Sequence, residues 1–214
     1  MWRYEVPVFR PHYLLEVDPN KLIENASRCP SVPEWVGERL RSIPFVVVRR
    51  GPVAGQDIAI GVRGAERNQR WAAFCDPTAV KRVITPPQLL RRAGSGRRGN
   101  AASALRSVHL LEKRWMDLDH SWGPGGSVGF ELATGSQAVR LESDLDIVIY
   151  AERPMTPDEA KWLCVRATGL PAVVDIRVET PACGFSLREY ANRIPAAILL
   201  RMPGGVMLGN RPWG

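Results

Sequence analysis

The sequence predicts an α+β protein with a small mixed α/β N-terminal domain and a separate C-terminal domain. Three observations support this prediction: β-branched runs interspersed with helical periodicity, an ordinary globular composition, and a stretch rich in Gly, Ser and Arg between the halves. Of the 214 residues, 45% are hydrophobic and 24% are charged, which excludes wholesale disorder. We therefore expect domains at residues 1–92 and 101–214, joined by a linker at 93–100.

In the N-terminal domain, the sequence predicts a helix followed by a β-hairpin. Residues 33–40 begin with a proline and carry an early acidic residue, which is typical of a first helical turn. Two β-branched runs follow at 45–49 and 57–62, and the Gly- and Pro-containing turn between them indicates a hairpin. Residues 76–88 contain three prolines and are expected to be a connection.

The C-terminal domain is expected to begin with a long amphipathic helix, because residues 101–118 repeat apolar side chains at helical spacing. A second helix is indicated by Thr156, a good N-cap, with proline and two acids in the first turn. The expected elements after the long helix are a glycine-rich turn, a helix at 128–133, a strand at 145–150, a helix at 156–167, and strands at 172–180 and 198–202.

Positive charge is concentrated in the first half of the chain. The formal net charge is +7, yet residues 1–110 hold 18 cations and 9 anions, whereas residues 111–214 hold 11 cations and 13 anions. This asymmetry indicates an acidic partner for the first half. If residues 64–74 form a helix or loop, Arg63, Arg67 and Arg70 bring three guanidinium groups to one surface; a solvated basic face is the alternative.

Several common sites are excluded by spacing or context. No apolar run approaches the roughly 18 residues of a membrane span. The four cysteines and three histidines lack zinc-site spacing, and we expect reduced thiols in a cytoplasmic protein. A G-x-G-x-x-G match at 94–99 has no strand before it. A G-x-S-x-G match at 125–129 has no preceding buried strand and no later histidine, which excludes a hydrolase elbow.

Acidic residues mark the two predicted strands of the second half. Asp144 and Asp146 lie at the start of one strand, and its period of two places both carboxylates on one face, roughly 6.5–7 Å apart. Asp175 supplies a third carboxylate from the other strand, with Glu179 as the alternate on the same face. Such carboxylates repel one another, and a divalent cation relieves the conflict. Three carboxylates can hold two Mg²⁺ ions roughly 4 Å apart, as in in-line displacement at phosphorus.

The residues before the helix at 128–133 predict an anion site. Backbone N–H groups at a helix N-terminus attract anions, and Gly126 and Ser127 open this helix, with the serine adding a hydroxyl. Arg177 shares a strand face with Asp175, so it either pairs with that carboxylate or contacts a triphosphate.

This order of motifs, a Gly-Ser turn, Asp-x-Asp on a strand and a third acid on a later strand, resembles the nucleotidyltransferase superfamily typified by DNA polymerase β. The resemblance implies that Asp144 and Asp146 bind both metal ions. It also implies that Asp175 assists one ion and activates the acceptor hydroxyl, while Gly126 and Ser127 hold a triphosphate. The gap of 17 positions from Ser127 to Asp144 exceeds the usual spacing, and the insertion around residues 134–137 is expected to be a loop.

Longer phrases are similar to a narrower family, the phosphoribosyl-dephospho-CoA transferases, which are the holo-acyl-carrier-protein synthases of malonate decarboxylase. The phrases are RPHYLL at 10–15, GVRGAERNQRWA, WGPGGSVGFELATG at 122–135, ESDLDIVI and VDIRVETP at 174–181. The resemblance covers most of the chain. It implies a polymerase β-type, nucleotidyltransferase-like C-terminal domain with Mg²⁺, expected as two ions.

The same resemblance implies a definite reaction. The donor is 2′-(5″-triphosphoribosyl)-3′-dephospho-CoA, the acceptor is a serine of the apo acyl carrier subunit, and pyrophosphate is released. Arg63, Arg67 and Arg70 are expected to grip the donor phosphates or an acidic carrier protein.

Two other functions stay open on the residues alone. One is a nucleotidyltransferase that uses an ordinary NTP on a small molecule, RNA or protein. The other is a non-enzymatic basic nucleic-acid-binding protein, which the charge permits. Groove-reading motifs and aromatic-rich platforms are absent from the sequence, so we expect neither a nucleic-acid nor a membrane partner.

Overall fold

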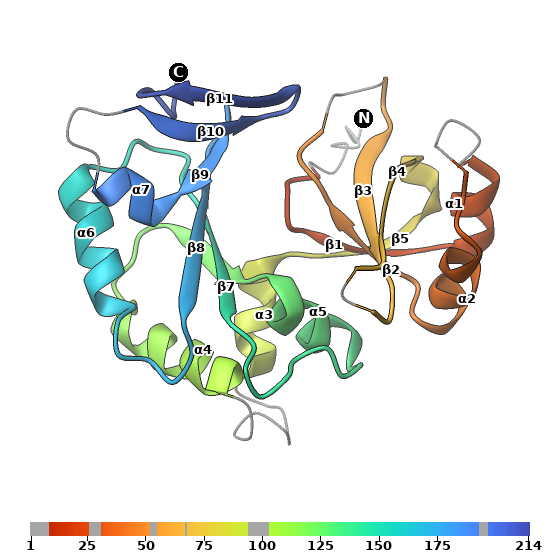
Figure 1. The fold of residues 1–214 in the computed structure, drawn as a ribbon, viewed down its shortest axis with the longest axis horizontal. Coiled ribbons are helices and arrows are strands. Elements are labelled where there is room, and N and C mark those ends of the chain that lie inside the picture. The colour runs from red at the N-terminus through yellow and green to blue at the C-terminus, as the bar shows by residue number, and fades with distance from the viewer. Residues whose placement is uncertain (1–8, 26–30, 52–54, 67, 94–102, 193–196) are drawn as a thin grey trace, which may run out of the picture. The chain divides into compact units, whose positions relative to one another are not determined.

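The computed structural model describes residues 9–25, 31–51, 55–66, 68–93, 103–192 and 197–214. It divides into two compact units, Met1–Val83 and Ile84–Gly214 (Figure 1). The division lies nearer the N-terminus than the predicted one, because helix α3 (Pro86–Ala93) packs against elements of the second unit. The predicted linker at 93–100 falls, from residue 94 onward, outside the described residues.

The first unit is a five-stranded sheet with the strand order β4-β3-β2-β1-β5. Its elements are β1 (Leu14–Val17), α1 (Pro19–Asn25), α2 (Glu34–Ser42), β2 (Phe45–Val48), β3 (Ile58–Arg63), β4 (Arg70–Cys75), a 3-10 turn (Pro77–Ala79) and β5 (Val80–Ile84). Helices α1 and α2 cover one face of this sheet, where Leu22, Val36 and Leu40 join strand residues such as Leu15 and Ile60 in a buried core.

The predicted helix at 33–40 and the hairpin are confirmed, since α2 forms and β2 pairs antiparallel with β3. The expectation of a helix or loop across residues 64–74 was wrong for residues 70–74, which belong to a strand. Trp71, Ala73 and Cys75 alternate with outward residues and bury their side chains, so this segment forms β4 against β3. The prediction that residues 76–88 are a connection was also wrong, because β5 lies within them. Their prolines lie on either side of this strand, in the 3-10 turn and at the start of α3.

The second unit is a six-stranded sheet with the strand order β11-β10-β9-β8-β7-β6. Its elements after α3 are α4 (Ser103–Arg114), β6 (Ser121–Pro124), α5 (Gly126–Thr134), β7 (Leu145–Tyr150), α6 (Pro157–Arg166), β8 (Val174–Glu179), β9 (Gly184–Ser186), α7 (Leu187–Ala191), β10 (Ile198–Met202) and β11 (Gly205–Gly209). Strands β7 and β8 are parallel and are joined through α6, whereas their outer neighbours β6 and β9 run antiparallel to them.

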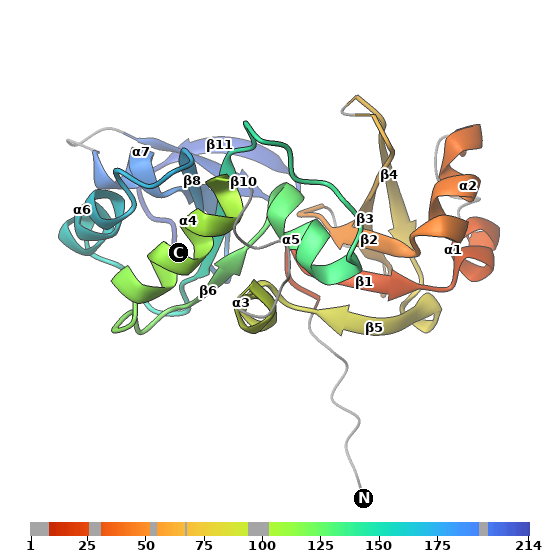
Figure 2. The same cartoon turned by 90° about the horizontal axis from the view of Figure 1, so that it is seen from below.

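One face of this second sheet is covered by α4 and α6 (Figure 2). Val108 and Leu111 of α4, together with Leu163 of α6, share a core with inward residues of β7 and β8 such as Ile147 and Ile176. Every second residue of these two strands therefore points away from that core. The α+β class is confirmed, and the polymerase β-type architecture stays a prediction.

Most elements predicted for the second unit are confirmed, including the Thr156 N-cap, whose side chain takes part in a capping box with Glu159. The prediction of a glycine-rich turn before α5 was wrong in one respect, because residues 121–124 form strand β6. A side chain at Gly123 would collide with the Pro86 backbone, so the glycine permits α3 to lie against this strand. None of the helices in the described part of the chain combines the length and apolar character of a membrane span.

Candidate active site

Two of the predicted carboxylates lie beside each other on the central parallel strands. Asp146 of β7 and Asp175 of β8 are register partners, and their apolar neighbours Leu145 and Val174 face the covered side of the sheet. Side chains in register on parallel strands point to the same face. Both carboxylates therefore leave the sheet on the side that α4 and α6 do not cover, and both are partly exposed.

Asp144 has a different setting from the other two. It lies just before β7 begins, and its side chain is exposed. Across the described residues, no group of three or more His, Cys, Asp and Glu side chains is close enough to hold a metal ion. The structure thus brings Asp146 and Asp175 together and leaves Asp144 at the solvent-facing end of the strand.

The start of α5 is held against Asp146 by its glycines. The backbone N–H of Gly125 donates a hydrogen bond of 2.9 Å to the carbonyl of Asp146. Gly126 has a φ of 53°, and a side chain there would collide with the Asp146 carboxylate. Glycine is therefore required at position 126 both for its backbone conformation and for its lack of a side chain. Ser127 follows Gly126 in the first turn of α5 and is half-buried.

After α5 ends at Thr134, residues 135–144 form a loop, as expected for the insertion, and this loop is tied to α5. The Glu131 carboxylate accepts hydrogen bonds of 2.8 Å from the backbone N–H groups of Ala138 and Val139. Gly135 ends the helix in a left-handed conformation, with a φ of 73°.

Arg177 pairs with Asp175, which was one of the two alternatives left open by the sequence. Its guanidinium lies 3.0 Å from the carboxylate, and the two side chains are 31% and 44% exposed. Solvent screens such a pair, so it contributes at most about 1 kcal/mol to stability. Glu179, the alternate third acid, is buried at the opposite end of β8 and is in register with Tyr150. Asp175 is therefore the acid beside Asp146.

The basic residues of the first unit form a smaller group than predicted. Arg63 and Arg70 are directly opposite each other on β3 and β4, and both point away from the buried core. The carbonyl of Arg63 accepts a 3.0 Å hydrogen bond from Nε of Arg39. Arg67 lies outside the described residues.

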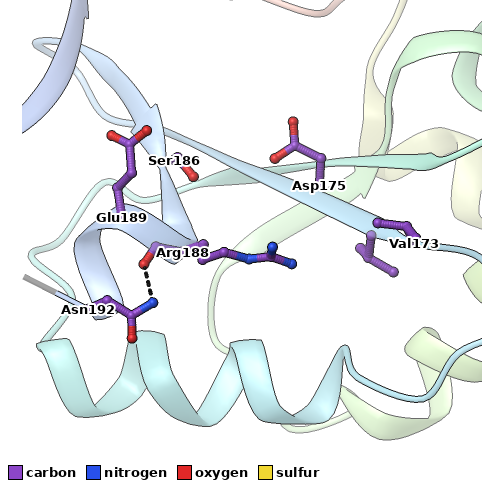
Figure 3. Close-up of a pocket in the computed structure, with 7 residues that line it drawn as sticks. Val173, Asp175, Ser186, Arg188, Glu189 and Asn192 are labelled. Carbon is purple, nitrogen blue, oxygen red and sulfur yellow. Dashed lines mark hydrogen bonds between the residues drawn. The ribbon is translucent and has the colours of Figure 1, made fainter.

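A pocket that the sequence did not indicate lies beside Asp175, on the side of β8 away from β7 (Figure 3). It has a volume of about 520 Å³ and is lined by Val173, Val174, Asp175, Ser186, Arg188, Glu189 and Asn192. Three of these residues, Ser186, Arg188 and Glu189, come from β9 and α7, which span only three and five residues, and Asn192 directly follows α7. Elements that short carry little periodicity, so the sequence gives no signal for the pocket.

The sequence is similar to known proteins along nearly its whole length. The family of the phosphoribosyl-dephospho-CoA transferase MdcG C-terminal domain matches residues 89–212, and the family of its N-terminal domain matches residues 10–86. No solved structure gives a significant match.

Individual proteins agree with these family matches. A phosphoribosyl-dephospho-CoA transferase of Azotobacter vinelandii is 38% identical over 188 residues, which are 86% of this chain and 86% of that protein. A protein of the same name from Pseudomonas aeruginosa is 36% identical over 204 residues, covering 95% of this chain and 93% of the relative. One from Pseudomonas putida is 36% identical over 206 residues, covering 95% of each. On these matches, this chain belongs to the phosphoribosyl-dephospho-CoA transferase family.

Proposed function

We propose that this transferase attaches a phosphoribosyl-dephospho-CoA group to a serine of the apo acyl carrier subunit of malonate decarboxylase. The donor is 2′-(5″-triphosphoribosyl)-3′-dephospho-CoA. The serine oxygen attacks the α-phosphorus and forms a phosphodiester, the bond to the leaving oxygen breaks, and pyrophosphate departs. The observation that supports this proposal is the placement of Asp146 against the N-terminus of α5 and next to Asp175.

Each group at this site has a role suited to its position. The backbone N–H groups at the start of α5, with the Ser127 hydroxyl, bind the triphosphate as an anion at a helix N-terminus. Asp175, whose carboxylate is 44% exposed, orients the serine and accepts its proton. Arg177 exchanges its ion pair with Asp175 for a contact to a donor phosphate.

The three acidic residues, all in the described part of the chain, offer the oxygen ligands that a divalent metal ion prefers, and they do not form a preassembled cluster of three. Mg²⁺ prefers carboxylate oxygens, and Asp146 and Asp175 already neighbour each other while the exposed Asp144 is free of the strand. These three residues would hold the two ions that we propose. Bound there, Mg²⁺ supplies neutralisation of the charge that develops on the leaving pyrophosphate.

The basic residues of the first unit have a separate proposed role. Arg63 and Arg70, with Arg67 between them in the sequence, grip donor phosphates or an acidic surface of the carrier subunit.

The proposal is tested by incubating the full chain with Mg²⁺, the triphosphoribosyl donor and the apo carrier subunit. We expect the mass of the carrier to increase by one prosthetic group, with release of one pyrophosphate. The variant Asp146→Asn should lose turnover by at least about a hundredfold, because the group nearest the start of α5 loses its charge. Asp117→Asn, at an exposed position, is the matched control.

Two results would contradict the proposal. One is transfer from ATP or CTP with none from the triphosphoribosyl donor, which would indicate an ordinary nucleotidyltransferase. The other is salt-sensitive binding to generic DNA without any transferase activity.

A further inference from the structure

The first half of β8 has an open edge. Strand β9 pairs with β8 only from Arg177 to Glu179, and Ser186, opposite Arg177, is its last residue. In the described part of the chain, no strand continues alongside Val174 and Asp175 on that side. The pocket of about 520 Å³ lies there instead, with α7 as its far wall.

The backbone of Val174 faces this open edge. The carbonyl of Val173 accepts a hydrogen bond from Leu145 of β7, so Val173 directs its polar backbone groups toward β7. Successive residues of a strand direct their N–H and C=O groups to opposite sides. Val174, which lines the pocket, therefore presents its N–H and C=O away from β7. An extended peptide can add to a strand that offers such groups.

The pocket also contains a positively charged side chain, Arg188, alongside the acidic residues Asp175 and Glu189. Figure 3 shows the Arg188 side chain reaching from α7 toward Val173. Among the described residues, none forms an ion pair or hydrogen bond with its guanidinium; the Arg188 carbonyl accepts a 3.0 Å bond from Asn192. The Glu189 carboxylate accepts a 3.4 Å bond from the backbone N–H of Leu199. An acidic side chain of a bound peptide is the complementary partner for Arg188.

The in-line geometry of the reaction indicates which of the two substrates would enter the pocket beside Asp175. Along the sheet the order is the start of α5, then Asp146, then Asp175, then the pocket. In an in-line displacement, the attacking oxygen approaches from the side opposite the leaving group. With the pyrophosphate at the start of α5, the attacking serine comes from the side of Asp175, where the pocket opens.

We propose that this pocket receives the serine-bearing segment of the acceptor protein. The segment lies extended along the open edge of β8, bonds to the backbone of Val174, and places an acidic side chain near its serine against Arg188. This inference rests on the proposed function, because that function supplies the direction of attack.

The kinetic test compares Arg188→Ala with the wild-type chain in steady-state transfer. The KM for the apo carrier subunit should rise by about tenfold, since one charge-assisted contact is lost, while the KM for the donor stays within about twofold. Arg106→Ala is the matched control, because Arg106 is an exposed arginine on α4, which covers the other face of the sheet. A raised donor KM with an unchanged carrier KM would place the donor in the pocket and overturn the inference, as would no change in either.

A binding test separates this inference from the proposed function. Fluorescently labelled apo carrier is titrated with the Asp146→Asn enzyme in the absence of donor, and anisotropy reports binding without chemistry. Adding Arg188→Ala should weaken this binding about tenfold, and adding Arg106→Ala should not. Absence of transfer by the wild-type enzyme would refute the proposed function, whereas equal carrier binding by both double variants would refute the pocket as the docking site.

Hydrogen–deuterium exchange locates the contact. Carrier should slow exchange in peptides that cover residues 173–176 and leave the other edge near β6 (Ser121–Pro124) unchanged. Protection at β6 with none at 173–176 would overturn the inference.

Discussion

The two sides of the candidate active site are built in different ways. On the β7 side, backbone geometry fixes the start of α5 against Asp146, and no side chain fits at Gly126. On the β8 side, Asp175 is partly exposed in a screened ion pair and borders an open pocket. A rigid cradle suits the triphosphate that we propose to bind there. An adjustable acid suits a step in which a second protein must enter and deliver its serine.

The largest expected effect is that of Gly126→Ala, which attacks the rigid side. The new methyl group would collide with the Asp146 carboxylate, and alanine is strained at a φ of 53°. We expect turnover to fall by at least about a hundredfold and the free energy of unfolding to fall by about 1–3 kcal/mol. Transfer kinetics and thermal unfolding measure the two effects.

Gly169→Ala is the matched control for that variant. Gly169 has a φ of 65°, but a side chain there meets nothing within 4 Å. This variant carries the backbone strain without the collision, so it should lose stability and keep its turnover. If Gly126→Ala and Gly169→Ala retain turnover equally, the contact between α5 and Asp146 is not needed for the reaction.

The next effect concerns the adjustable side. Asp175→Asn removes the proposed proton acceptor, so turnover should fall by about a hundredfold or more. The free energy of unfolding should change by less than about 1 kcal/mol, because the lost pair with Arg177 is partly exposed. Asp158→Asn breaks another exposed pair, with Lys161, and serves as the control without loss of turnover. Normal turnover in Asp175→Asn would transfer the role of third acid to another residue.

This contrast also explains which features could be predicted from the sequence. In β7 and β8 the alternation of apolar residues encodes both the strand and the face that carries Asp146 and Asp175. Their register does not follow from either strand alone, because a parallel pair is aligned by the intervening helix and its packing. Strand prediction thus gave the residues, and tertiary structure was needed to show that they are neighbours.

Two of the missed elements, β9 and α7, depend on distant contacts. Phe185 of β9 and Tyr190 of α7 pack their rings against Trp213, far along the chain. Thr180 donates a 2.7 Å hydrogen bond to the carbonyl of Pro212, which holds the chain end near the turn before β9. Such short segments are stabilised by these partners and not by local propensity. These short segments form one side of the pocket beside Asp175, and for this reason the sequence did not predict the pocket.

A smaller effect is expected from His120, which directly precedes β6, on the pH dependence of the free energy of unfolding. Burial, followed by the nearby charge of Arg153, lowers the pKa of His120 below its ordinary value of 6.5. The unfolded chain therefore binds the proton more readily, and the stability from neutral His120 is complete above 6.5 and declines as pH falls toward the folded-state pKa. Thermal unfolding at several pH values should show a shallower acid loss in His120→Gln.

The acid loss due to His120 can be separated from that of Glu159. Hydrogen bonding to Thr156 lowers the pKa of Glu159 below its ordinary value of 4.5, so its stabilisation declines only at more acidic pH. An equal slope near pH 6 in wild type and His120→Gln would show that protonation of His120 does not couple to folding.

The smallest expected effect is that of Arg70→Gln in the first unit. The arginines there lie on an exposed charged surface, unlike the residues of the candidate active site in the second unit. Arg70 and Arg63 place like charges opposite each other, so removing one should leave the free energy of unfolding unchanged or slightly higher. The KM for either the donor or the carrier should rise about threefold at low salt, and the substrate affected identifies what the arginines grip. Arg41→Gln, an exposed position on α2 across the sheet, is the control.

Since screening by added salt weakens exposed charge contacts, the threefold difference in KM should vanish at high ionic strength. A difference that persists there would mean that Arg70 makes a desolvated contact, and the first unit would then hold its substrate as firmly as the second.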